Sequence, residues 1–353
     1  MGPTPAALTP TSTMDPESVR AGSRVPHGGT TDPTVLDFSA NTNPERPDGV
    51  ETVYREAFDA STRYPDDDYA DFRAAAGDYV GCAPEAVVPT AGGLEALRLA
   101  FEVTLAPGDT ALVPEPSFGE YDREIRLQGA EPVAVAHDAV LDADPEPHAV
   151  AVVCTPNNPT GELASADDLR SFAARCREAE TVLVVDEAFL DFTDEPSLAG
   201  DPGVVVARSL TKMFGLPGVR AGFAVATGDL GDRLAVARRA WSLSTPAAAV
   251  GAYCMDDAEF VSHTRARVAT ERERLRETLS EAFEVYPSDA PFLLLDVGDR
   301  DVDAVVETSR DHGVAVRDAT TFPTLDSHVR VAVKRPDEND ELLRALAAVA
   351  TDV

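Results

Sequence analysis

Lysine is nearly absent from this chain of 353 residues, and that scarcity narrows what the protein can do. Only Lys212 and Lys334 occur, so the other 28 of the 30 basic residues are arginine. Acidic residues number 62, which gives a net charge of -32. Such a surface repels nucleic acid phosphates and anionic membranes. The sequence therefore predicts neither a nucleic acid partner nor a membrane partner.

Long hydrophobic runs and closely spaced cysteines are missing as well. No run approaches 18 apolar residues and the N-terminal stretch has no apolar core, so we expect no membrane span and no signal peptide. The four cysteines lie far apart, with no CxxC pair and no nearby histidine, which argues against a zinc or iron–sulfur site. Scattered thiols suit a reducing compartment. We expect a cytoplasmic protein without a metal.

The acidic residues are spread along the chain, whereas a metal-binding acidic protein would cluster its carboxylates. An even spread with almost no lysine is typical of a solvated surface in high salt, where screening removes the self-repulsion. We therefore interpret the chain as a protein of an extreme halophile. On this interpretation the charge carries no information about the substrate.

Apolar runs typical of buried strands alternate with stretches of helical character. The apolar runs cover residues 110–113, 149–154, 181–185 and 203–207, and the helical stretches cover 93–105, 118–128 and 165–178. Ser165 followed by Asp168 predicts the start of the last of these helices, with negative charge in its first turn. Strands that alternate with helices predict βαβ units and a mostly parallel sheet, and hence an α/β fold.

The pattern divides the chain into four parts. Residues 1–24 are rich in Pro, Thr, Ser and Ala and predict a loose segment. Residues 25–44 are expected to form an arm that joins the smaller domain, and residues 45–245 the large α/β domain. Residues 246–353 predict a smaller α+β domain, which opens with one long helix to about residue 283 and ends with a helix from about residue 337.

Four motifs fall at predicted strand ends, where open α/β sheets bind ligands. Gly92-Gly93-Leu94 opens a helix, and glycines there let backbone N–H groups approach an anion. Asn158 lies in an Asn-Pro turn, and Asp186 follows four apolar residues, so a buried carboxylate with a cationic partner is expected. Lys212 comes next. Lysine can lose its proton and form a Schiff base, which arginine cannot do.

Taken together and in this order, the motifs resemble those of fold-type I pyridoxal-phosphate enzymes. From about residue 35 to the C-terminus the chain is similar to the class I/II aminotransferase family. The resemblance implies a three-layer large domain with a mostly parallel sheet, a smaller α+β domain, pyridoxal 5'-phosphate as the cofactor and a homodimer.

The resemblance also implies a role for each motif residue. Lys212 is the catalytic residue that forms a Schiff base with the cofactor, Asp186 pairs with the protonated ring nitrogen, and Asn158 binds the phenolic oxygen. Phe118 matches the aromatic residue that stacks on the cofactor ring. The residues implied to hold the cofactor phosphate are Gly92, Gly93, Leu94, Ser209, Arg220 and, across the dimer interface, Tyr64.

The N-terminal part narrows the resemblance further. His27-Gly28-Gly29 and the segment Ser39-Ala40-Asn41-Thr42-Asn43-Pro44 resemble the opening of threonine-phosphate decarboxylases of cobalamin biosynthesis. Many aminotransferases have a tyrosine where this chain has Phe189, and the decarboxylases commonly have phenylalanine there. This resemblance implies decarboxylation of L-threonine O-3-phosphate to 1-amino-2-propanol phosphate.

The substrate contacts follow from the same resemblance. Arg330 matches the arginine that clamps the substrate α-carboxylate, a task suited to its bidentate guanidinium, and Asn43 is expected to help it. Arg317 is the candidate for the substrate phosphate, with His27 as a helper.

Two alternatives stay open. The first is transamination, by a histidinol-phosphate aminotransferase of histidine biosynthesis or by another class I/II aminotransferase. Histidinol-phosphate aminotransferases share the Asn-x-Asn-Pro element and also act on an amino substrate that bears a phosphate. A protein of this fold that binds its ligand without catalysis is the second alternative. The intact set of Lys212, Asp186, Asn158, Arg220 and Arg330 argues against it.

Overall fold

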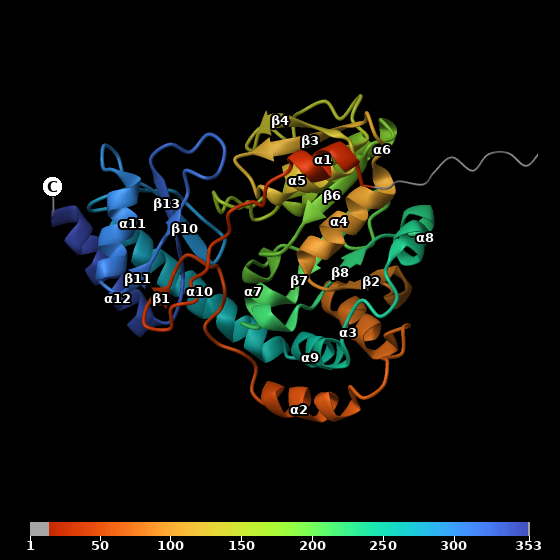
Figure 1. The fold of residues 1–353 in the computed structure, drawn as a ribbon, viewed down its shortest axis with the longest axis horizontal. Helices are drawn as coiled ribbons and strands as arrows, with labels where there is room; N and C mark the ends of the chain where they lie inside the picture. Colours follow the sequence, from red (N-terminus) through yellow and green to blue (C-terminus); the bar gives the residue numbers. More distant parts are fainter. Residues whose placement is uncertain (1–13, 352–353) are drawn as a thin grey trace, which may run out of the picture.

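A seven-stranded sheet forms the centre of the larger part of the molecule (Figure 1). The computed structural model describes residues 14–351. The strands in spatial order are β2 (Val87–Thr90), β8 (Gly222–Val225), β7 (Val204–Ser209), β6 (Val182–Asp186), β5 (Val150–Cys154), β3 (Thr110–Glu115) and β4 (Glu131–Ala136). All neighbours pair in parallel except β8, which is antiparallel to both β7 and β2.

Helices cover both faces of this sheet because its strands are apolar on both sides. Val150 and Val152 of β5 pack in one core with residues of α4, α5 and α8, and Ala151 and Val153 pack in another core with residues of α6. The helices of this part are α2 (Val50–Ala60), α3 (Ala70–Val80), α4 (Gly93–Thr104), α5 (Glu120–Leu127), α6 (Ala166–Glu178), α7 (Leu210–Met213), α8 (Gly228–Ala237) and α9 (Thr245–Met255). The three-layer α/β prediction is confirmed.

The predicted start of α6 is also confirmed. The Oγ of Ser165 accepts a hydrogen bond from the backbone N–H of Asp168 at 3.1 Å. The helix therefore begins where its capping residue satisfies a free backbone donor.

A second, antiparallel sheet lies in the C-terminal part, drawn in blue in Figure 1. Its order is β12 (Arg317–Asp318), β13 (His328–Ala332), β10 (Phe292–Asp296) and β9 (Glu284–Val285), and the helices beside it are α10 (Ala258–Leu279), α11 (Val302–Asp311) and α12 (Pro336–Thr351). The N-terminal strand β1 (Leu36–Asp37) pairs in parallel with β11 (Val314–Ala315). Residues 36 and 37 are thus held against the C-terminal part of the molecule.

The prediction of one long helix from residue 246 to about 283 was wrong. Two helices, α9 and α10, occupy this stretch, and they are separated at Asp256 and Asp257. Asp257 ends the first helix because its carboxylate accepts the backbone N–H of Phe260 at 2.9 Å and so starts the second.

A short helix, α1 (Pro16–Ala21), lies within the segment expected to be loose. Asp15 caps it by accepting the backbone N–H of Ser18 at 2.7 Å, and the backbone N–H of Asp15 donates to the carbonyl of Leu127 at 2.8 Å. The rest of the expected loose segment, residues 1–13, lies outside the described residues.

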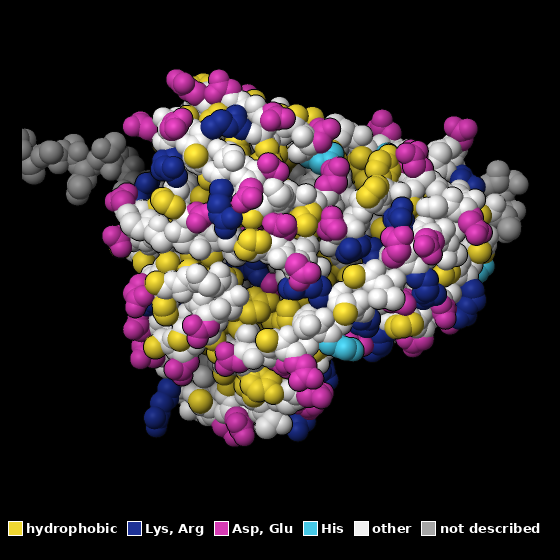
Figure 2. All heavy atoms as spheres, turned by 180° about the vertical axis from the view of Figure 1, so that it is seen from behind, with side chains coloured by type: hydrophobic (Ala, Val, Ile, Leu, Met, Phe, Trp, Pro, Cys, Tyr) yellow, Lys and Arg dark blue, Asp and Glu magenta, His cyan; other side chains and the backbone are white. Residues whose placement is uncertain are grey.

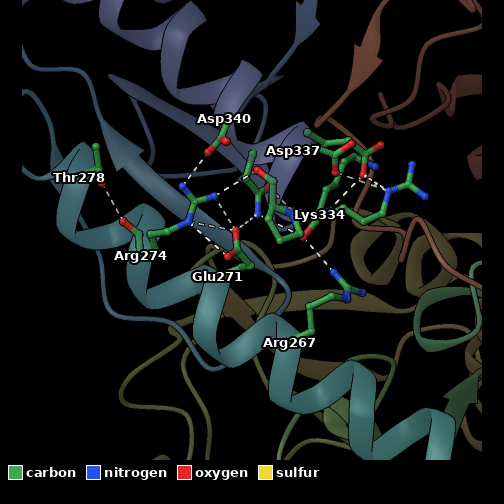
Figure 3. A network of polar contacts seen from close by, with 11 residues as sticks. Arg267, Glu271, Arg274, Thr278, Lys334, Asp337 and Asp340 are labelled. Atoms are coloured by element: carbon green, nitrogen blue, oxygen red, sulfur yellow. Dashed lines mark hydrogen bonds and ion pairs between the residues drawn. The ribbon is translucent and has the colours of Figure 1, made fainter.

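A buried polar cluster, which we call the α10–α12 network, joins these two helices to the chain beyond β13 (Figure 3). Glu271 accepts hydrogen bonds from Arg274 at 2.7 Å and from the amide of Asn339 at 2.8 Å. Asn339 also bonds the backbone N–H and carbonyl of Lys334, and Arg274 reaches Asp340 at 2.8 Å. The carboxylates of this network therefore meet a cation.

Carboxylates are scattered over the face seen in Figure 2, with arginines between them and no single acidic patch. Among the described residues, no group of histidine, cysteine, aspartate and glutamate side chains could hold a metal ion. No helix in the described part of the chain combines the length and apolar character needed to cross a bilayer.

Candidate active site

A cavity of about 240 Å³ lies where the parallel strands of the large sheet end and the second sheet faces them. Cys154 and Asp186 close β5 and β6, and Lys212 follows the end of β7, so parallel pairing brings these residues to one edge. The second sheet contributes Arg317 and Arg330, and the N-terminal segment contributes residues 25–28 and 39–41. The cavity thus combines residues from both ends and the middle of the chain.

Asp186 is a buried carboxylate held by two donors. Its Oδ2 accepts the hydroxyl of Tyr121 at 2.6 Å, and its Oδ1 accepts the backbone N–H of Ala188 at 3.0 Å. Burial raises the pKa of Asp186 above its ordinary value, while the Tyr121 hydrogen bond and the nearby Lys212 act to lower it. The carboxylate is therefore oriented, and it faces the cavity with capacity to accept a further donor.

Lys212 lies in the short helix α7 at the cavity wall. Burial lowers the pKa of its amine to about 8, and the positive charge of Arg330 acts in the same direction, whereas Asp186 opposes the shift. Desolvation disfavours the ammonium form, so an appreciable fraction of the amine is neutral near pH 8. A neutral amine is the form that attacks a carbonyl carbon.

The start of α4 forms a cradle for an anion. A Cβ atom on Gly92 would lie 2.7 Å from Nη2 of Arg220, and one on Gly93 would lie 3.1 Å from Cβ of Ser209. Gly92 also has a φ of 98°, which favours glycine. The N–H groups of Gly93 and Leu94 lie at the very start of α4, where no helical carbonyl precedes them by one turn. Backbone donors, a hydroxyl and a guanidinium therefore converge here, as phosphate binding requires.

Two arginines stand directly opposite each other on neighbouring strands of the second sheet. Arg317 of β12 and Arg330 of β13 are register partners, so their side chains leave the same face, and both line the cavity. Among the described residues no carboxylate lies within 4 Å of either guanidinium. Burial, and then the charge of Arg317, lower the pKa of Arg330 to about 9. Like charges placed opposite each other destabilise a sheet.

The guanidinium groups are held by neutral acceptors instead. Arg330 donates to Oδ1 of Asn158 and to the carbonyl of Ser39 at 3.2 Å, and its buried Nε has no partner within the described chain. Arg317 donates to the carbonyl of Pro26 at 2.9 Å and to the hydroxyl of Thr321 at 2.8 Å. Both cations therefore keep their charge unneutralised beside the cavity.

His27 and Phe118 lie together at the mouth of the cavity. Their ring centroids are 5.8 Å apart, and Nε2 of His27 contacts Oε1 of the buried Glu120 at 2.9 Å. Phe118 also meets Tyr121 edge to face, at 5.6 Å between centroids. The loop before α5 thus supplies the aromatic wall, and the first residue of α5 supplies the carboxylate that contacts His27.

Asn43, expected to contact the substrate, is turned away from the cavity. Its Nδ2 donates to the carbonyl of Met213 at 2.7 Å, and its Oδ1 accepts from Arg267 at 2.6 Å. Asn41 lines the cavity instead, with a buried Oδ1 that has no partner among the described residues. A tight turn, closed by the N–H of Thr42 on the carbonyl of Ala40 at 2.9 Å, is centred on Asn41, and Asn43 follows it. The sequence motif contains both residues and could not distinguish them.

Tyr64 does not reach the cavity of its own chain. It is 78% exposed and stacks on Trp241, with 4.4 Å between ring centroids. Sequence reasoning also missed Tyr121, because a tyrosine within an amphipathic helix carries no local signal for a contact with Asp186, 65 residues away. The other predicted site residues that line this cavity are His27, Phe118, Asn158, Asp186, Lys212, Arg317 and Arg330.

Comparison with known proteins matches this arrangement to one family. The family model of aminotransferase class I and II matches residues 33–346. Histidinol-phosphate aminotransferases are among the most similar curated relatives. One, from Archaeoglobus fulgidus, is 30% identical over 331 residues, covering 90% of this chain and 94% of the relative. A relative from Caldanaerobacter subterraneus, provisionally named a threonine-phosphate decarboxylase, is 30% identical over 308 residues and covers 81% of this chain and 82% of its own.

Solved structures share the fold. The L-threonine-O-3-phosphate decarboxylase of Porphyromonas gingivalis has a TM-score of 0.81 at 23% identity and covers 89% of this chain and 99% of its own. The histidinol-phosphate aminotransferase of Sinorhizobium meliloti, solved in complex with pyridoxal-5'-phosphate, has a TM-score of 0.81 at 21% identity, with 89% and 90% covered. Likeness at this identity shows the fold alone.

Proposed function

Because this chain belongs to the aminotransferase class I and II family, we propose that it is a pyridoxal-phosphate enzyme that decarboxylates L-threonine O-3-phosphate. The opposed pair Arg317 and Arg330 carries the proposal. Two cations without an acidic partner beside one cavity suit a ligand with two anionic groups, such as a carboxylate and a phosphate. Each anion would remove the repulsion that the pair otherwise suffers.

The residues around the cavity fit pyridoxal 5'-phosphate, which is the cofactor of this enzyme. Gly92, Gly93, Leu94, Ser209 and Arg220 would hold its phosphate, since a side chain on either glycine would fill the space at Arg220 and Ser209. Asp186 would pair with the ring nitrogen, and Asn158 would bind the phenolic oxygen. Phe118 would cover one face of the ring. When bound, the cofactor withdraws the electron pair left on the substrate Cα.

The protein's own residues then orient the substrate, and this orientation determines which bond to Cα breaks. Arg330 holds the substrate carboxylate, and Arg317, with His27, holds the substrate phosphate. Asn41, in place of the expected Asn43, offers a buried carboxamide to the bound substrate. The bond from Cα to the carboxylate carbon breaks, CO2 leaves, and Lys212 or a water adds a proton to Cα. Lys212 can supply that proton from its ammonium form, because its pKa of about 8 lets it change charge near neutral pH.

Two features support loss of CO2 over transfer of the amino group. Phe189 is buried beside Lys212, with the amine 5.8 Å from its ring centroid, and it has no hydroxyl to offer the cofactor. Residues 25–28, which include the His27-Gly28 part of the element that resembles the decarboxylases, line one side of the cavity.

Histidinol-phosphate transamination is the second candidate, favoured by the names of most relatives. One pair of assays decides between the two. The protein is incubated in high salt with pyridoxal 5'-phosphate and either phosphothreonine, with CO2 measured, or histidinol phosphate and 2-oxoglutarate, with glutamate measured. We expect CO2 from the first mixture and little glutamate from the second. Glutamate without CO2 would establish the aminotransferase instead. A Lys212→Ala variant controls for chemistry that the free cofactor performs alone.

We also propose that the enzyme is a homodimer. Exposed aromatic residues lie on or near α2 and α9, which are next to each other in Figure 1. They are Tyr54, Phe58, Tyr64, Trp241 and Tyr253. Tyr64 would then reach the cofactor phosphate of the other subunit. Light scattering in high salt should give twice the chain mass, and Tyr64→Phe should weaken cofactor retention without changing that mass.

A further inference from the structure

Tyr121 contacts Asp186 but has no role in the reaction proposed above. It is fully buried in α5, and its hydroxyl donates to Oδ2 of Asp186 at 2.6 Å. Burial and the charge of Asp186 raise the pKa of Tyr121 well above its ordinary value, so its hydroxyl keeps its proton. Because a carboxylate only accepts hydrogen bonds, the direction of this one is fixed.

The contact orients Asp186 before any ligand arrives. With Ala188 on Oδ1 and Tyr121 on Oδ2, each carboxylate oxygen already accepts one donor. Donors to a carboxylate stabilise its charged form and make it a weaker base. Burial acts against them and makes the carboxylate a stronger base. The Tyr121 hydroxyl is therefore the side-chain group that opposes the effect of burial most directly.

We propose that Tyr121 is a positioning residue that keeps the Asp186 carboxylate a weaker base than the cofactor ring nitrogen it faces. The shared proton then stays on the ring nitrogen, where the positive charge draws electrons from the substrate Cα. Without the hydroxyl, Asp186 takes more of the proton and the ring is a weaker electron acceptor. This inference rests on the pairing of Asp186 with the ring nitrogen proposed above.

One short segment, from Phe118 to Tyr121, contributes both the aromatic wall of the cavity and the residue that holds Asp186. The backbone N–H of Tyr121 donates to the carbonyl of Phe118 at 3.1 Å, and the two aromatic rings meet edge to face. Phe118 borders the cavity, while Tyr121 lies behind it with the thiol of Cys154 beside its hydroxyl. A change in the position of α5 would thus move the aromatic wall and the partner of Asp186 together.

The test is nitrogen NMR of the enzyme loaded with pyridoxal 5'-phosphate labelled with 15N in the ring. In Tyr121→Phe we expect the ring-nitrogen resonance to move toward that of a neutral pyridine. We also expect the variant to bind the cofactor with about 10-fold lower affinity. Tyr79→Phe is the matched control. It removes another buried tyrosine hydroxyl, which lies near Asp191 instead of Asp186 and has no hydrogen bond among the described residues. It should leave the ring-nitrogen resonance in place and the cofactor affinity within about twofold of the wild type.

A Tyr121→Phe resonance equal to that of the wild type would overturn the inference. The Asp186→Asn variant separates it from the proposed function. If Asp186→Asn leaves the resonance in place, Asp186 is not the partner of the ring nitrogen. If Asp186→Asn moves the resonance and Tyr121→Phe does not, only the role of Tyr121 fails.

Should Tyr121→Phe not fold, 3-fluorotyrosine placed at position 121 keeps both the ring and the hydroxyl. Its 19F resonance should move when the cofactor is loaded, and the movement should be lost in Asp186→Asn. The same probe at position 79 should stay in place. Equal movement at the two positions would refute a specific coupling between Tyr121 and the ring.

Discussion

Two arginine-rich regions of this molecule treat charge in opposite ways. In the α10–α12 network of Figure 3, Arg274 meets Glu271 at 2.7 Å and Asp340 at 2.8 Å. At the cavity, Arg317 and Arg330 face each other without a carboxylate within 4 Å among the described residues. A buried charge costs free energy unless it is paired. The network is therefore complete by itself, whereas the cavity is complete only with an anionic ligand.

The two lysines of the chain divide between these regions. Lys334 joins the network through its backbone, and its amine lies 5.7 Å from the centroid of the Phe38 ring. Lys212 borders the cavity beside Asp186 and Arg330. Burial lowers the pKa of both amines. A shifted pKa alone thus does not mark a catalytic lysine, and the neighbouring anion site makes the difference.

The largest effect on activity should come from replacing the cavity lysine, and replacing the other lysine is its control. Lys212→Ala should lower kcat by at least about 10^4-fold, because Lys334, the other lysine, does not line the cavity and cannot replace the lost amine there. Lys334→Met should leave kcat within about threefold. Borohydride reduction followed by peptide mass spectrometry should find the cofactor on the peptide with Lys212. Cofactor on the Lys334 peptide would contradict the assignment of Lys212 as the catalytic lysine.

The next largest effect concerns the opposed arginines. Arg330→Lys should lower kcat/KM by about 10^2-fold, since lysine cannot reproduce the bidentate contact of a guanidinium. Arg317→Gln should raise KM for the phosphorylated substrate by about 10-fold and change the reaction of unphosphorylated threonine little. Steady-state assays with both substrates measure this. Equal losses on both would remove Arg317 from the phosphate site.

The reactivity of Lys212 should follow pH with a midpoint near 8. Its pKa is lowered by burial, so the amine is protonated and unreactive below the midpoint and becomes neutral above it. The rate of cofactor uptake by the apoenzyme should rise about tenfold per pH unit below 8 and level off above it. Arg330→Gln should move the midpoint upward, because it removes a positive charge that disfavours the ammonium. A midpoint near the ordinary 10.5 in the wild type would contradict this account.

The smallest effect on activity should come from breaking the network. Asn339→Ala removes one donor to Glu271 and the acceptor of the Lys334 backbone N–H, which should lower the free energy of unfolding by about 1–3 kcal/mol. Activity of the folded protein should stay within about twofold. Arg344→Ala, which removes an exposed ion pair with Glu341, is the control and should change stability by less than about 1 kcal/mol. Denaturant unfolding at fixed salt measures the stability of both variants. Equal losses of stability would mean that the burial of the Asn339 contacts is irrelevant.

Local patterns predicted most of the fold. Runs such as Val150–Cys154 are apolar at every position, which only a sheet covered on both faces accommodates, and Ser165 with Asp168 marked the start of α6. The boundary between α9 and α10 was missed because Asp257 acts as a capping residue inside a stretch of strong helix formers. Such a boundary depends on one capping hydrogen bond, and the average helix propensity of the surrounding residues does not reveal it.

The motifs also predicted which residues would gather at the cavity, because strand ends in a parallel sheet share one edge. They did not predict which asparagine of the Asn41-Thr42-Asn43 segment faces the cavity, since a tight turn sets that direction. Nor did they reveal Tyr121, Glu120 or the direct opposition of Arg317 and Arg330. Those contacts join segments 65, 93 and 13 residues apart.

The sequence alone therefore determined the α/β order of the elements, the family, and the lysine that can act as an amine, because each depends on local periodicity or on one side chain's chemistry. The tertiary structure decided which charges are neutralised and which are left for a ligand. That decision depends on burial and on the distance between groups remote in the chain, and neither quantity is defined until the two sheets meet.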